Sequence, residues 1–319
     1  MNGKIKILIL SIVLFYSPLT WNLSDCFGQN VEMELSKSPM IKDANGKMIK
    51  VEKPFKRIIS LYGAHTENLF YLGLDKEIIG VTRNESFPEA AQKKPVFSVQ
   101  DDPEKFLGSG ADLVLVRPMI ERGYPDLVKR LEKSGIAVVS LQPGTVDEMY
   151  DYWLTLGKLA GKEQAATKMV TDFKNKISLY KSALDKELPG ENRSPKKVYF
   201  EAIHSKMKTF TPGSMALFAL ETAGGSNVAT DAEASRGTNI GNYGKEKILS
   251  RAAEIDVFLA QNGAMNQVSV DMIKNEPGFG IIKAVKNNEI YIIDETIVSR
   301  PCFRLLQGVE QINRILYRE

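Results

Sequence analysis

One long segment near the middle of this 319-residue chain limits what the chain can fold into. From Glu163 to Leu184 there is neither glycine nor proline, and apolar residues return at alternating intervals of three and four. These apolar positions are Ala166, Val170, Phe173, Ile177, Tyr180 and Leu184. The period predicts an amphipathic helix about 30 Å long at 1.5 Å per residue, long enough to run along two separate lobes.

A second predicted helix comes directly before this segment. Thr145 is a suitable N-cap residue, the apolar period continues to Ala160, and Gly161 ends the helix. We therefore assign residues 145–188 to linking helices, the longer of which connects what lies on either side.

Short apolar strands alternate with helical segments on both sides of the linking helices. The predicted strands are Arg57–Leu61, Ile78–Val81, Pro95–Val99, Ala111–Val116 and Ile136–Leu141 before them, and Lys197–Ala202, Ile255–Ala260 and Glu289–Asp294 after them. This alternation is typical of parallel sheets with helices on their faces. The predicted fold class is therefore α/β, with two lobes of mostly parallel sheet, 40–144 and 195–319, joined by one long α-helix. Asn45-Gly46 adds a hairpin turn at the start of the first lobe.

The first residues have the layout of a secretory signal peptide, which we place at residues 1–28. Lys4 and Lys6 precede an apolar run over residues 7–16, and Pro18 ends that run. The run is short for a bilayer-spanning helix, so a membrane-anchoring helix is the less favoured alternative.

Two alternative cleavage sites for the signal peptide are consistent with the sequence. Leu23–Cys26 resembles a lipoprotein cleavage box, in which Cys26 would carry the lipid, although Asp25 fits that box poorly. A cut after Gly28 would instead remove Cys26. Both alternatives place the protein in the periplasm or at the outer face of the cytoplasmic membrane.

Composition excludes several classes of protein. The only cysteines are Cys26 and Cys302, too few for a disulfide framework or a thiolate metal site. The only histidines are His65 and His204, so a metal site built on three histidines is impossible. A net charge of +3 gives no indication of nucleic-acid binding.

Enzyme motifs are also missing from the sequence. It contains no Gly-x-Ser-x-Gly elbow, no His-Glu-x-x-His and no phosphate-binding loop. An exported hydrolase with a triad scattered along the chain remains an alternative, as does a ligand sensor or scaffold without a transport role.

Several segments together resemble a known family. They are Pro54–Leu61, Ala64–Glu67, Gly110–Val114, Ala223–Asn227, Ala284–Asn288 and Ser299–Gly308. In their order and spacing, over roughly Met40 to Tyr317, they resemble the vitamin B12- and ferric-siderophore-binding class of periplasmic binding proteins.

The resemblance implies a receptor of an ABC-type importer. Such a protein would act as a monomer without a cofactor of its own and deliver its ligand to the permease dimer. The ligand would be a metal chelate: a ferric siderophore first, a corrinoid second and haem third. The resemblance also implies that one glutamate on each lobe contacts the permease, and the matching positions are Glu67 and Glu246.

Side chains that follow the carboxyl ends of predicted strands are candidates for the ligand site, because open α/β sheets bind ligands at that edge. The candidates are Tyr62, Arg83, Arg117, His204 and Arg300, with Arg236 and Tyr243 in a glycine-rich loop. Arginine binds carboxylates in a bidentate manner, and tyrosine has an apolar face with a polar end. As a set they predict an anionic or oxygen-rich ligand, although any single one is equally consistent with ordinary loop charge.

The two histidines carry different expectations. His65 lies in the first turn of a predicted helix, where a structural role is expected. His204 leaves two alternatives open, a structural hydrogen bond or a position in the cleft as a ligand of haem iron.

Overall fold

The computed structural model of the protein describes residues 40–187, 194–235 and 238–317. The predicted signal peptide, Cys26 and Arg236 lie outside these residues. Within the described residues, no helix is long and apolar enough to cross a membrane.

A two-stranded antiparallel hairpin opens the N-terminal lobe, as its Asn-Gly turn predicted. Strand β1 (Met40–Lys42) pairs with β2 (Met48–Lys50). The carboxylate of Asp43 accepts hydrogen bonds from the backbone N–H groups of Asn45 and Lys47, both at 2.9 Å. Gly46 has a φ of 85°, a conformation that glycine adopts without strain.

The N-terminal lobe contains a four-stranded, wholly parallel sheet. Its strands are β3 (Ile58–Ser60), β4 (Ile78–Val81), β5 (Leu113–Val116) and β6 (Ala137–Ser140), in the order β4-β3-β5-β6. Alternate residues enter different cores: Ile58 and Leu113 pack toward one, Ile59 and Val114 toward the other. Both sheet faces are therefore covered, which explains the continuous apolar runs. The predicted strand at 95–99 is reduced to one bridge between Val81 and Val96.

Five helices accompany this sheet. They are α2 (Gly63–Tyr71), α3 (Glu89–Gln92), α4 (Pro103–Gly108), α5 (Pro118–Gly123) and α6 (Pro125–Lys133). The sequence did not predict α3 and α5, because each is a short surface helix: α5 buries no residue and α3 buries only Ala91.

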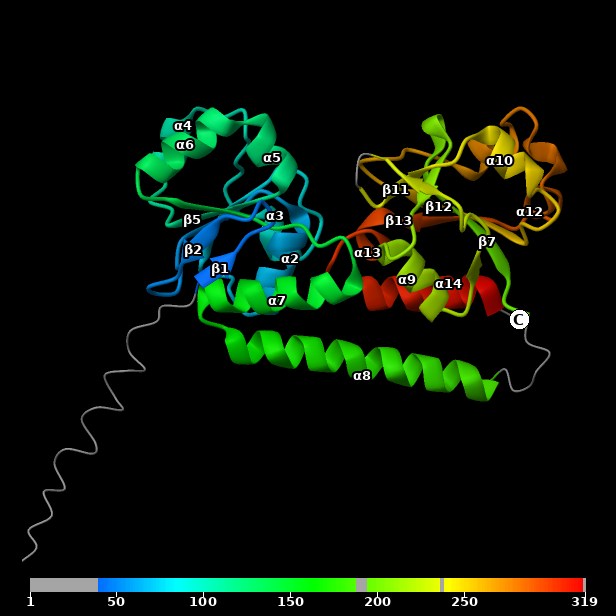
Figure 1. Cartoon of the computed structure of the whole chain (residues 1–319), viewed down its shortest axis with the longest axis horizontal. Coiled ribbons are helices and arrows are strands. Elements are labelled where there is room, and N and C mark those ends of the chain that lie inside the picture. The colour runs from blue at the N-terminus through cyan, green and yellow to red at the C-terminus, as the bar shows by residue number, and fades with distance from the viewer. Residues whose placement is uncertain (1–39, 188–193, 236–237, 318–319) are drawn as a thin grey trace, which may run out of the picture. The chain divides into compact units, whose positions relative to one another are not determined.

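The linking helices form an antiparallel pair, and the longer one reaches both lobes. Helix α7 (Val146–Ala160) begins with a complete capping box between Thr145 and Glu148, and it ends at Gly161 with a φ of 66°. Helix α8 (Glu163–Glu187) then packs against α7, and also against α9 (Met215–Thr222) and α14 (Leu305–Tyr317) of the second lobe (Figure 1). One helix therefore joins the lobes, as predicted.

The C-terminal lobe is built on a seven-stranded mixed sheet. Its main path runs β10-β11-β8-β7-β12-β13, and β9 also pairs with β7. These strands are β7 (Lys197–Ile203), β8 (Lys208–Phe210), β9 (Ser226–Asn227), β10 (Glu233–Ala234), β11 (Ile240–Asn242), β12 (Val257–Asn262) and β13 (Ile290–Asp294). Strands β7, β9, β12 and β13 are parallel, whereas β8, β10 and β11 add antiparallel pairs that the sequence did not predict. The added strands have only two or three residues, too few to show a period of two.

The remaining helices of this lobe are short apart from α9 and α14. They are α10 (Lys245–Ser250), α11 (Val270–Lys274), α12 (Lys283–Lys286), α13 (Glu295–Val298) and two 3-10 turns, η1 (His204–Lys206) and η2 (Phe279–Ile281). Helices α13 and α14 follow β13, and α14 lies beside α9 (Figure 1).

One apolar core runs through both lobes and the linking helices. It contains Ile58 of the first sheet, Trp153 of α7, Phe173 of α8 and Phe200 of the second sheet. A separate core covers the other face of each sheet. Because the main core is shared, the two lobes are held together by burial of apolar surface as well as by the chain.

Candidate functional site

The best candidate site lies at the seam between the lobes, where four polar side chains meet. Tyr62 follows β3, Glu85 follows β4 and Arg117 follows β5, so the N-terminal lobe presents three of them beyond the carboxyl ends of its strands. Arg300 comes from the other lobe, from the segment between α13 and α14. We call Ser299–Arg304 the seam segment.

The two arginines flank Tyr62. The guanidinium carbon of Arg117 lies 4.5 Å from the centre of the Tyr62 ring, within range of a cation–π interaction. Arg300 lies against Gly63, where a Cβ atom would fall 2.5 Å from Nη1. Glycine at this position therefore admits the arginine of the opposite lobe. Burial raises the pKa of Tyr62, with both arginines opposing, so its phenol is neutral at pH 7.

Neither arginine has an acceptor among the described residues. Nε of Arg117 and Nη1 of Arg300 are buried without a hydrogen-bond partner, and no ion pair involves either side chain. Each arginine is half-buried as a residue. The site thus holds two positive charges, each with a buried donor that has no partner within the described residues.

Glu85 is the member of the site that the sequence did not predict. Its Oε1 atom accepts a hydrogen bond from the Thr66 hydroxyl at 3.0 Å, and its Oε2 atom is buried without a partner. Burial raises the pKa of Glu85 to about 7, while the hydrogen bond from Thr66 and the charge of Arg300 act in the opposite direction. The only sequence signal was its position in the loop after β4, where Arg83 carries the more conspicuous charge.

Glu67 was expected to contact a permease, and the structure corrects this prediction. Its side chain is 3% exposed and forms two hydrogen bonds with Arg304, at 2.9 and 2.8 Å. The pair joins α2 to the seam segment, so it connects the two lobes. A carboxylate buried and bound in this way is not available at the surface.

The backbone of the seam segment is held from the N-terminal side as well. The carbonyl oxygen of Pro301 accepts hydrogen bonds from Asn68 Nδ2 at 2.9 Å and from Trp153 Nε1 at 3.1 Å. The ring of Phe303 stacks on that of Tyr71, with 4.3 Å between centroids. These contacts fix the segment that carries Arg300.

His65 has the structural role expected of it. It is fully buried, its Nδ1 lies 2.7 Å from the Tyr152 hydroxyl, and its Nε2 lies 3.1 Å from the carbonyl oxygen of Val116. Burial lowers its pKa to about 3. The neutral imidazole therefore donates from Nε2 to Val116 and accepts the Tyr152 hydroxyl proton at Nδ1.

His204 is bound by side chains of its own lobe, as the structural alternative expects. Its Nδ1 lies 3.0 Å from the fully buried carboxylate of Glu201, and its Nε2 lies 3.7 Å from Glu276. Lys245 pairs with the same Glu276. We call Glu201, His204, Lys245 and Glu276 the His204 cluster.

The charge state of His204 follows from its two acidic neighbours. The hydrogen bond to Glu201 raises the pKa of His204, and Glu276 adds to this effect. Burial raises the pKa of Glu201, whereas the hydrogen bond from His204 lowers it. Because two carboxylates face one imidazole, we assign the imidazolium form to His204.

The other predicted site residues lie elsewhere. Tyr243 is buried in the core of the C-terminal lobe, with its ring centroid 5.8 Å from that of Tyr199, so it is not a surface contact. Arg83 is exposed and does not join the four seam residues.

Glu246 is exposed in the first turn of α10, as a docking residue requires. Cys302 is fully buried beside the seam, and burial raises the pKa of its thiol.

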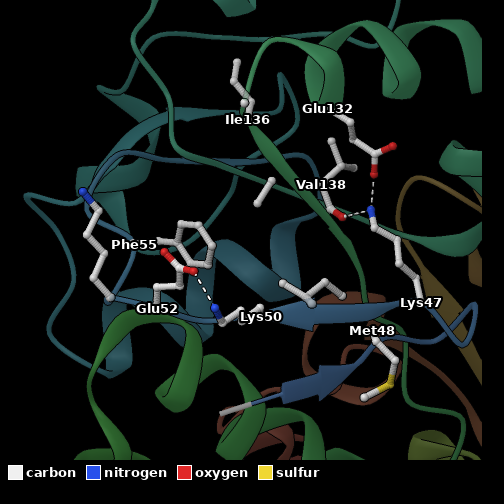
Figure 2. A pocket seen from close by; sticks show the side chains of 12 residues that line it. Lys47, Met48, Lys50, Glu52, Phe55, Glu132, Ile136 and Val138 are labelled. Carbon is white, nitrogen blue, oxygen red and sulfur yellow. Dashed lines mark hydrogen bonds and ion pairs between the residues drawn. The ribbon is translucent and has the colours of Figure 1, made fainter. Parts of the chain in front are cut away.

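A surface hollow of about 540 Å³ lies on a different part of the N-terminal lobe (Figure 2). It is lined by the β1–β2 hairpin, Phe55, Glu132 and strand β6, with Lys47 reaching Glu132 and the Val138 carbonyl. It shares no residue with the seam and has only lysine–glutamate pairs at its rim. We therefore place the functional site at the seam.

The chemistry of the seam residues favours anionic groups over a bare metal ion. In the described residues, no group of three or more His, Cys, Asp and Glu side chains could hold a metal ion. Two guanidinium groups and a neutral phenol instead suit carboxylates or metal-bound oxygens of a ligand.

Comparisons with known proteins identify relatives of this chain. An ABC transporter substrate-binding lipoprotein of Bacillus subtilis, YvrC, is 26% identical over 281 residues, covering 87% of this chain and 85% of that protein. The vitamin B12-binding protein of Vibrio cholerae is 22% identical over 264 residues, covering 82% of this chain and 89% of that protein.

A solved structure shows the same fold. It is a periplasmic solute-binding protein of Staphylococcus epidermidis, described as a possible iron-binding protein, with a TM-score of 0.70 and 26% identity. The match covers 83% of this chain and all of that one. The sequence pattern of the periplasmic binding protein family matches residues 58–297, which is most of the chain. The chain therefore belongs to the periplasmic binding protein family.

Proposed function

We propose that this protein is the extracytoplasmic receptor of an ABC importer and that it binds a metal chelate at the seam between its lobes. The observation that carries the proposal is the pair of half-buried arginines, Arg117 and Arg300, one from each lobe and neither with an acceptor in the part of the chain that the structure describes. A ligand that supplies the acceptors would contact both lobes at once.

The relatives support the class of ligand. They include a vitamin B12-binding protein, a possible iron-binding protein and a substrate-binding lipoprotein of an ABC transporter. We propose accordingly that the chain has no cofactor of its own and that any metal it carries is cargo.

Calorimetric titration with a panel of chelates tests this function. We expect at least one of ferric siderophore, cobalamin and haemin to bind with one-to-one stoichiometry at micromolar affinity or better. The Arg117→Gln and Arg300→Gln variants should weaken that binding, while Arg130→Gln, a surface arginine on α6, should not. Binding of free metal ions or amino acids alone would contradict the proposal.

We also propose that the protein binds without catalysing a reaction, which distinguishes it from an exported hydrolase. The purified protein, incubated with model esters at the concentrations used in enzyme assays, should hydrolyse them no faster than buffer alone does. Turnover that disappears on substitution of a single buried nucleophile would refute this part.

Docking on the permease dimer is proposed for the C-terminal lobe through Glu246. This carboxylate is exposed at the start of α10 and makes no ion pair among the described residues. Charge complementarity with a basic partner would raise the rate of encounter. Glu246→Arg should lower uptake in cells and leave ligand affinity unchanged, whereas Glu233→Arg, another exposed position of the same lobe, should alter neither.

A further inference from the structure

The two seam arginines differ from a third arginine close by. Arg304 lies on the same segment as Arg300, with 14% of its side chain exposed, and is neutralised by the bidentate contact with Glu67. Arg117 and Arg300 have no such partner in the described residues. Half-buried charge without a counter-charge is unfavourable, because burial removes water from the guanidinium group without replacing its hydrogen bonds.

The acids around the seam do not supply the missing charge. Glu67 is occupied by Arg304, and the Glu295 carboxylate accepts a hydrogen bond from the backbone N–H of Met265 at 3.1 Å. Glu85 is bound to Thr66, makes no ion pair with Arg300, and has a pKa of about 7, so much of it is uncharged near neutral pH. Neither Arg117 nor Arg300 therefore has a direct ion-pair partner within the described residues, and a ligand can supply one.

We infer that Arg117 and Arg300 each bind one carboxylate of the transported ligand, so that the cargo is a metal chelate carrying at least two carboxylates. The inference rests on the proposed function and specifies its ligand. Because the arginines flank Tyr62 from opposite lobes, two acceptors on one ligand can reach both. A chelate without carboxylates would leave both guanidinium groups unpaired and would be bound less tightly.

Three exposed apolar side chains belong to segments that adjoin the site and suit the body of such a ligand. Met119, two residues after Arg117, is 52% exposed, and Met265, bound through its N–H to Glu295, is 50% exposed. The Phe87 ring, 42% exposed, lies 4.3 Å from the guanidinium carbon of Arg304. Methionine adapts to irregular ligands, so an apolar chelate with acidic edges matches this surface better than a wholly polar one.

Paired ligands that differ only in their carboxylates test the inference. Haemin has two propionates, and haemin dimethyl ester has none. Ferric citrate supplies carboxylates without an apolar body, while cobalamin and ferric desferrioxamine lack free carboxylates. We expect haemin, ferric citrate or both to bind at micromolar affinity, and the ester to bind roughly tenfold more weakly than haemin or worse.

Variants locate the effect. Arg117→Gln and Arg300→Gln should each weaken binding of the diacid roughly tenfold and leave binding of the diester unchanged. Arg117→Lys and Arg300→Lys keep the positive charge but lose the bidentate hydrogen bonding of the guanidinium group. They should give intermediate affinities. Arg130→Gln is the matched control, and thermal unfolding of each variant shows whether the fold is retained.

The outcomes separate the inference from the proposed function. If haemin and its diester bind equally, or if only cobalamin or ferric desferrioxamine binds, the carboxylate inference is overturned while the receptor function stands. If no chelate of any class binds, the receptor function itself fails, and the inference with it. Binding of ferric citrate without haemin sustains the arginine contacts and identifies a small polar chelate as the cargo.

Discussion

The two histidines of this protein lie in two regions of similar burial and opposite electrostatics. His65, on α2 of the N-terminal lobe, is surrounded by a tyrosine hydroxyl and a carbonyl oxygen, and burial lowers its pKa to about 3. His204, after β7 of the C-terminal lobe, lies between two carboxylates, which raise its pKa. One imidazole is neutral and the other charged, although both are almost completely buried.

The difference teaches that burial alone does not set the charge of a buried group. At His65 the hydrogen bond to the neutral Val116 carbonyl opposes desolvation without outweighing it, whereas the ionised partners of His204 outweigh it. The same contrast extends to their surroundings. The region around His65 binds the opposite lobe through Glu67 and Asn68, while the His204 cluster stays within its own lobe. Changes near His65 should therefore affect the contact between lobes, and changes near His204 should affect one lobe alone.

The largest effect is expected at the ion pair that crosses the seam. Glu67→Ala leaves the largely buried Arg304 without its counter-charge, which should lower the free energy of unfolding by about 4 kcal/mol. Urea denaturation measures the loss. Glu310→Ala breaks an exposed pair with Arg314 on α14 and should cost about 0.5 kcal/mol or less. Equal costs for the two variants would show that the seam pair is not essential to the contact between lobes.

A smaller loss in the free energy of unfolding is expected from a substitution in the His204 cluster. His204→Gln removes the cation beside Glu201, whose carboxylate is fully buried and has no other side-chain partner among the described residues. We expect a loss of about 2 kcal/mol. Because its folded pKa is raised, the contribution of His204 is fully present below pH 6.5 and declines as the pH rises through the folded value. A loss that grows toward alkaline pH would contradict the charged assignment.

His65 should produce the opposite dependence on pH. Its folded pKa of about 3 lies below the value of about 6.5 in the unfolded chain. Stability is therefore complete above pH 6.5 and falls as the pH decreases, by about 2 kcal/mol at pH 5. His65→Gln should be less stable at pH 7, because it loses buried hydrogen bonds, yet it should lack this acid-dependent decline. An identical decline in variant and parent would break the contrast between the two histidines.

The smallest effect is expected at Glu85, which is only half-buried. Its pKa of about 7 lies above the usual value of 4.5, so the folded protein prefers the protonated form. Its contribution is present below pH 4.5 and is lost as the pH rises toward and beyond 7. Glu85→Gln should therefore gain stability relative to the parent between pH 5 and pH 8. A constant difference across this range would show that Glu85 ionises normally.

Much of the fold was predictable because the signals were local. The spacing of Ala166 to Leu184 set the long helix, and the apolar runs at Ile58 and Leu113 set strands buried on both faces. The strands β8, β10 and β11 could not be predicted, because two or three residues carry no period and their pairing is decided by contacts along the sheet edge.

The candidate site could be located in part from the sequence, by the expectation that ligands lie beyond the carboxyl ends of strands. Tyr62, Arg117 and Arg300 satisfy that rule and meet at the seam. The same rule included Arg83, which stays exposed, and His204, which is bound to Glu201. It did not select Glu85, because nothing in the sequence distinguishes that loop carboxylate from the other acids of the surface.

The sequence by itself determined the alternation of the longer strands and helices, the linking helix and membership of the family, since each depends on residue types at fixed spacing along the chain. Only the tertiary structure decided which charges are paired. Glu67 and Arg304 are far apart in the sequence and become partners across the seam, while Arg117 and Arg300 acquire none. Charge state and availability depend on neighbours in space, and folding alone brings those neighbours together.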